Sequence, residues 1–112
     1  MPTHTHIIDL TKLVKPPLTD SISGRDEGEV FARDERVLEH VAQGEHIILR
    51  IDEQFVRAIN GSFILGFFNK VFERLHSKRL VKEQFEIEGV EFYQRLFEKN
   101  WDILDSIYAP AE

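Results

Sequence analysis

Residues 46–75 constrain the fold of this chain more than any other segment does. They open with a run of β-branched and aliphatic residues ending at Asp52, cross a short stretch to Gly61 and Ser62, and continue as an apolar run from Phe63. A short β-branched run predicts a strand, and a longer run that is apolar on most sides predicts a buried helix. The segment is therefore predicted to be a βα unit with a hydroxyl group at the start of its helix.

Further strand and helix patterns alternate along the rest of the chain. We predict strands over residues 6–14, 45–52 and 84–88 and helices over residues 24–42, 62–77 and 91–108. This alternation favours an α/β fold with a small, mainly parallel sheet of three or four strands and about three helices. The continuous apolar run Ile47-Ile48-Leu49 predicts a strand that is covered on both faces.

Length and composition narrow the function classes. The 112 residues suffice for one domain, residues 1–112, with one core. The absence of cysteine excludes disulfides, thiol nucleophiles and cysteine-ligated metals. A net charge of −6 argues against nucleic-acid binding, and no segment approaches the roughly 18 apolar residues of a membrane span. Because the first residues lack the pattern of a signal peptide, we expect a cytoplasmic protein.

The helix predicted over residues 91–108 carries aromatic residues at helical spacing, which predicts a core-facing stripe. Phe92 and Ile103 fall off this stripe and indicate a second apolar side, as in protein-interaction faces. The stripe consists of Tyr93, Phe97, Trp101 and Tyr108.

Ser62 is the first candidate for a functional group, and two interpretations compete. As the N-cap residue, its hydroxyl would accept a hydrogen bond from a backbone N–H group one turn ahead. As a phosphorylation site, it would place a phosphate where unpaired N–H groups and the helix dipole tolerate negative charge. The phosphate would still add close to two negative charges, and against a partner packed on that surface this would act as an off-switch.

Three segments of the chain share their order and spacing with a known family. They are Ser23-Gly24-Arg25 with Gly28, Ile47-Ile48-Leu49-Arg50-Ile51-Asp52, and Ile59-Asn60-Gly61-Ser62-Phe63. In these segments the chain resembles the STAS domain, the sulfate-transporter and anti-sigma-factor-antagonist fold, and more closely the bacterial STAS-like domains of unknown function. The resemblance covers residues 7–75 and, more loosely, the remainder. It implies a non-enzymatic regulatory module without a cofactor, and a protein partner that is a kinase-like ATPase or an anti-sigma-type regulator.

The resemblance also implies roles for single residues. In phosphorylatable STAS proteins the turn resembles Asp-Ser-Ser-Gly, and a partner kinase modifies a serine in it. Ser62 matches the modified serine, Asn60 stands where the acid would be, and Gly61 stands where the first serine would be. Phe63 replaces the glycine that usually follows. On this basis Ser62 is the expected switch, with Asp52, Asn60, Gly61, Phe63 and Arg25 as candidate partner contacts.

Two other function classes stay open. One is a small metal-dependent enzyme whose loop carboxylates converge at strand ends, since paired carboxylates hold Mg²⁺ or transfer protons. The other is a homo-oligomeric structural subunit that assembles through the aromatic helix. The carboxylates in question are Asp9, Asp20, Asp26 and Asp52.

The five histidines are not expected to form a metal site. His4 and His6 belong to a polar start of the chain, and His40, His46 and His76 are separated in sequence. A metal site needs three or four converging ligands, so surface or helix-end roles are expected for these side chains.

Overall fold

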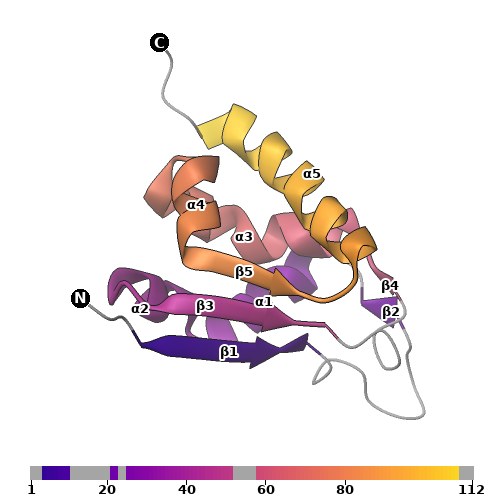
Figure 1. Ribbon diagram of the computed structural model, residues 1–112. Helices are drawn as coiled ribbons and strands as arrows, with labels where there is room; N and C mark the ends of the chain where they lie inside the picture. Colours follow the sequence, from indigo (N-terminus) through magenta and orange to yellow (C-terminus); the bar gives the residue numbers. More distant parts are fainter. Residues whose placement is uncertain (1–3, 11–20, 23–24, 52–57, 109–112) are drawn as a thin grey trace.

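A three-stranded parallel sheet organises the protein, whose computed structural model describes residues 4–10, 21–22, 25–51 and 58–108 (Figure 1). The strands are β1 (Thr5–Asp9), β3 (His46–Arg50) and β5 (Phe85–Glu88), in the order β1-β3-β5. A two-residue parallel pair, β2 (Ser21–Ile22) with β4 (Ala58–Ile59), was not predicted. The predicted α/β class with a small parallel sheet is confirmed.

The described part of the chain contains five helices where three were predicted. The helix beginning at Gly61 and the last helix match their predicted spans closely. One extra helix arises because the first predicted helix is broken in two, and the other lies in the connection between residues 75 and 85. The helices are α1 (Arg25–Asp34), α2 (Val37–Ala42), α3 (Gly61–Leu75), α4 (Lys78–Gln84) and α5 (Glu91–Tyr108).

The predicted helix over residues 24–42 is wrong as one element, because it breaks at Arg36. This residue adopts a left-handed conformation with φ of 57°, which ends α1 and reorients α2. Phe31 and Val37 are both buried. Six residues apart on a continuous helix, their side chains would point in directions about 120° apart, so the break brings both into the core.

The helices pack on one face of the sheet, and the prediction that the central strand is covered on both faces is wrong for the described residues (Figure 1). Along β3, Ile47 and Leu49 are buried, whereas Ile48 is half-buried and Arg50 is exposed. The outer face carries cross-strand ion pairs, Arg50 with Glu88 and His46 with Glu86, which keep that face polar.

The core lies between the sheet and α3, which is apolar on most of its surface. Phe68 is fully buried, and its ring meets the rings of Phe85, Phe97 and Trp101 edge-on at 5.0, 6.1 and 5.3 Å between centroids. Edge-to-face packing of this kind is favoured by the ring quadrupoles. The predicted core stripe of α5 is thus confirmed, with Tyr108 half-buried at its end.

Helices α1 and α3 cross at two glycines. A Cβ on Gly28 would collide with the carbonyl oxygen of Phe63, and a Cβ on Gly66 would collide with the carbonyl oxygen of Arg25. The absence of both side chains lets the two backbones touch, which fixes the start of α1 against the first half of α3.

Candidate functional site

Helix α3 is capped at its N-terminus by the side-chain amide of the residue that precedes it. Asn60 is the N-cap residue, with extended backbone angles, and its Oδ1 accepts a hydrogen bond from the N–H of Phe63 at 3.0 Å. The interpretation of Ser62 as the N-cap is therefore wrong. Asparagine caps helices as well as serine does, so the residue type alone did not decide between the two positions.

Ser62 is the second residue of α3, and its side chain is exposed. Its hydroxyl is not required for capping, because Asn60 performs that function. The N–H groups of a first helical turn and the positive end of the helix dipole favour an anion at this position. The hydroxyl is thus accessible, and its surroundings tolerate a phosphate.

Gly61 lies beneath α5. An added Cβ on Gly61 would come within 2.9 Å of Oδ1 of Asn100, a buried residue whose Nδ2 donates to the carbonyl oxygen of Leu96 at 2.9 Å. Asn100 was not singled out from the sequence, where it is one polar residue inside an otherwise amphipathic helix. Asn100 packs over Gly61, which leaves no room for a larger residue at that position.

Arg25 lies near Ser62 in the folded chain. Its carbonyl oxygen packs against Gly66, which is one helical turn after Ser62 on the same side of α3. The Arg25 side chain is exposed. The resemblance-based expectation of Arg25 as a contact residue stays a prediction.

The two remaining expected contact residues behave differently. Phe63 is 1 % exposed and packs its ring against Phe31 and Phe67, so it belongs to the core and offers no side-chain surface to a partner. That expectation is corrected, since an aromatic residue in the first turn of a buried helix faces inward. Asp52 lies outside the described residues.

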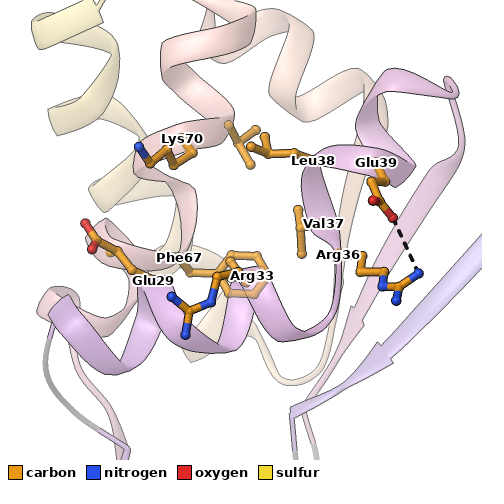
Figure 2. Close-up of a pocket in the computed structure, with 11 residues that line it drawn as sticks. Glu29, Arg33, Arg36, Val37, Leu38, Glu39, Phe67 and Lys70 are labelled. Atoms are coloured by element: carbon orange, nitrogen blue, oxygen red, sulfur yellow. Dashed lines mark ion pairs between the residues drawn. The ribbon is translucent and has the colours of Figure 1, made fainter.

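A pocket of about 310 Å³ opens between α1, α2 and α3 (Figure 2). Figure 2 shows Phe67 and Val37 inside it, with Glu29, Arg33 and Lys70 around one side and Arg36 with Glu39 on the other. The size is at the lower end of the range for ligand sites, and it fits one apolar side chain of a partner. Lys70 follows Ser62 by eight residues, about 12 Å along α3. The start of α1 covers Gly66 between them, so the pocket and the hydroxyl lie on either side of the helix crossing.

The loop carboxylates proposed for a metal enzyme are not brought together among the described residues. Asp9 lies at the end of β1 opposite Arg50, and Asp26 is exposed in the first turn of α1. Asp20 and Asp52 lie outside the described residues.

One set of three metal-ligand side chains does converge in the described part of the chain. His6 of β1, His40 of α2 and Glu45 bring ligand atoms within 4.8 Å of one another. The expectation of a polar tail and separate surface histidines missed this cluster. The sequence offers one sign of the cluster. His6 lies on a predicted strand, and His40 and Glu45 lie at the next connection from a helix to a strand.

A charged network joins α4 to α5. Nζ of Lys78 lies 2.5 Å from Oδ1 of Asp102, a hydrogen bond that raises the pKa of the Lys78 ammonium. Nζ of Lys82 lies 2.9 Å from Oε2 of Glu98. Hydrogen bonds from Lys82 and then Lys78 lower the pKa of the Glu98 carboxyl. These groups pair with each other across the two helices, as expected of a surface network rather than of a substrate site.

Helix α5 also carries exposed apolar side chains. Phe92 is 66 % exposed and Ile107 is 63 % exposed, and Ile103 lies between them on the same side of the helix. Asn100 lies on the adjoining side, over Gly61. The off-stripe residues noted in the sequence are thus exposed, but the exposed Arg95 and Lys99 lie between Phe92 and Ile103.

Comparison with protein-family models, with curated proteins and with solved structures gives no significant match. The STAS-like resemblance therefore stands on the residues that carry it. Among the described helices, none has the combined length and apolar character needed to cross a bilayer.

Proposed function

We propose that this protein is a non-enzymatic regulatory interaction module of STAS-like type, whose partner docks at the start of α3 and is released by phosphorylation of Ser62. The observation that carries the proposal is the exposed Ser62 hydroxyl at a helix start already capped by Asn60. A side chain that is neither a cap nor part of the core is free for modification.

The pocket between α1, α2 and α3 favours a partner that is partly apolar and partly acidic. The pocket is apolar inside, and Arg33, Arg36 and Lys70 contribute three positive charges at its rim against two from Glu29 and Glu39. This arrangement fits a partner segment that inserts one apolar side chain between acidic residues, because rim charges select complementary partners. A kinase-like ATPase or an anti-sigma-type regulator is the partner class that the resemblance implies.

Phosphorylation would change this surface in two ways. We expect a phosphate on Ser62 to attract the exposed Arg25 guanidinium, since charge-assisted bonds from arginine to phosphate are strong. It also adds nearly two negative charges at the start of α3, which would repel acidic residues of a partner docked there. Both effects weaken docking, so the modification acts as an off-switch.

The test is affinity capture from the native host with wild-type, Ser62→Ala and Ser62→Asp chains as bait, followed by phosphopeptide mapping. We expect the first two chains to retain the partner, the aspartate chain to lose it, and Ser62 to appear among the modified residues. Thr5→Asp is the matched control, because it converts an exposed hydroxyl residue on β1 into a carboxylate away from α3. Equal capture by all four chains would refute the switch.

A second candidate function is homo-oligomerisation, favoured by the exposed apolar residues Phe92, Ile103 and Ile107 on α5. Aromatic side chains are enriched at interfaces. Sedimentation equilibrium across a wide concentration range distinguishes the two, because a self-assembling chain gains mass with concentration. Phe92→Glu would reverse that gain and leave partner capture through α3 unchanged.

A further inference from the structure

We propose that His6, His40 and Glu45 form a binding site for a single Zn²⁺ ion. The site is independent of the Ser62 surface, because it lies at the amino end of the parallel strands and α3 begins near their carboxyl end (Figure 1). Its three side chains come from β1, from α2 and from the residue before β3.

The distances are close to those that a metal ion requires. The ligand atoms of the three residues all lie within 4.8 Å of one another, and Nδ1 of His40 lies 2.8 Å from Oε1 of Glu45. Bonds of about 2.0–2.1 Å in a tetrahedral site hold the ligand atoms roughly 3.3 Å apart. The ligand atoms are thus already near one another, and side-chain rotation would complete the site.

The imidazole rings show which movement is needed. The rings of His6 and His40 are stacked, with centroids 3.7 Å apart and an angle of 13° between their planes. A metal ion lies in the plane of each ring that binds it, so one ring must rotate out of the stack. Both side chains are half-buried.

Two of the ligands are held in place by the backbone. The connection from α2 to β3 is closed by hydrogen bonds from the N–H of Gly44 to Val41 and from the N–H of Glu45 to His40, at 3.0 and 3.2 Å. Nε2 of Gln84 donates to the carbonyl oxygens of Val41 and Glu45, both at 3.0 Å. His40 and Glu45 are therefore presented by a rigid turn, which lowers the entropic cost of binding.

The ligand chemistry selects the ion. Two imidazoles and one carboxylate form the zinc-binding set of several known site types, with water in the fourth position. Mg²⁺ and Ca²⁺ prefer oxygen ligands throughout, so the two nitrogens disfavour them. Glu45 is 8 % exposed, and a divalent cation would neutralise its buried carboxylate.

The experiment is calorimetric titration of the untagged full-length chain with Zn²⁺ and, separately, with Mg²⁺. We expect one Zn²⁺ per chain, no Mg²⁺ binding, and a rise in melting temperature that EDTA reverses. His6→Gln, His40→Gln and Glu45→Gln should each weaken Zn²⁺ binding at least about 100-fold, since loss of even an outer-shell partner commonly costs 10–100-fold.

His46→Gln is the matched control. His46 follows Glu45 directly, but its side chain lies on the other face of the sheet, where Nε2 lies 3.0 Å from Oε1 of Glu86. The control chain should bind Zn²⁺ as the wild type does. A loss of binding in the control, or unchanged affinity in the three ligand variants, would show adventitious binding and overturn the proposal.

A measurement on the wild-type chain covers the case in which a ligand variant fails to fold. Imidazole ¹⁵N resonances of His6 and His40 should shift on addition of one equivalent of Zn²⁺, while those of His46 and His76 stay in place. Shifts confined to His46 or His76, or no shifts at all, would refute the site. Because neither readout involves a protein partner, its failure is distinguishable from failure of the Ser62 switch.

Discussion

Gly66 of α3 contacts the carbonyl oxygen of Arg25 at the start of α1 so closely that no side chain fits between them. The contact sets the position of Arg25 relative to Ser62, four residues earlier on α3. The proposed switch therefore depends on a packing contact between two backbones.

We expect Gly66→Ala to destabilise the fold by about 3 kcal/mol, because the added methyl group overpacks a backbone contact that cannot yield. At an exposed helix position the same change would stabilise by up to about 1 kcal/mol. Urea unfolding measures the difference. Gly89→Ala is the control, since its Cβ would meet the carbonyl oxygen of Ile51 at 3.3 Å and needs only a small adjustment. Equal stability of the Gly66 variant and the wild type would contradict the crossing described here.

A second prediction separates the two residues of the helix start. Asn60→Ala should cost about 1 kcal/mol of unfolding free energy, the usual loss for an N-cap side chain. Ser62→Ala should change it by less than about 0.5 kcal/mol, as for an exposed residue without a structural role. Thermal or urea unfolding of the two variants side by side checks this. A larger loss for Ser62→Ala than for Asn60→Ala would restore Ser62 as the cap and remove the basis of the switch.

The fold was largely predictable from the sequence, because the elements that are most buried also have the clearest pattern of apolar residues. β3 is a short run of aliphatic residues, and the apolar residues of α3 and α5 recur at helical spacing, so the predicted positions of all three are confirmed. The short helix α4 was missed because, of its seven residues, only Val81 is buried, which leaves almost no period to detect.

The candidate sites were less predictable, for a different reason. Hydrophobic period indicates which face of an element is buried, but not which side chains from distant elements meet. His6 and His40 are 34 positions apart in the chain, and only the packing of α2 against the sheet stacks their rings. Likewise, the choice between Asn60 and Ser62 as the cap depends on where the helix begins to within two residues, and patterns do not resolve this.

The aromatic core provides a third prediction. Phe68→Ala should destabilise the protein by about 3–5 kcal/mol, because it removes a fully buried ring that four other aromatic rings contact. Phe92→Ala should cost far less, since the Phe92 ring is 66 % exposed. Denaturant midpoints of the two variants give the comparison. If the Phe92 variant lost as much stability as the Phe68 variant, α5 would have to be rotated from the orientation described here.

The last prediction concerns pH and the network between α4 and α5. Hydrogen bonds from Lys82 and Lys78 lower the pKa of the Glu98 carboxyl in the folded protein. A lowered folded-state pKa contributes stability that is present above the unfolded-state pKa and is lost as the pH falls through the folded-state value. The contribution is therefore complete at neutral pH and disappears in the acid range. It is small, because these groups are at the surface and solvent and salt screen them.

Replacing Lys82 with methionine removes the strongest of these interactions while keeping the aliphatic stem. The pKa of Glu98, followed by NMR titration of its side-chain carboxyl, should then rise toward its ordinary value, and the remaining shift should come from Lys78. Lys99→Met is the matched control, because Lys99 is an exposed lysine next to Glu98 in sequence for which the structure shows no ion pair in the described residues. The opposite result, with a changed Glu98 titration in the Lys99 variant and an unchanged one in the Lys82 variant, would contradict this arrangement. Glu98 would then pair with a charge on its own helix and not with Lys82 of α4.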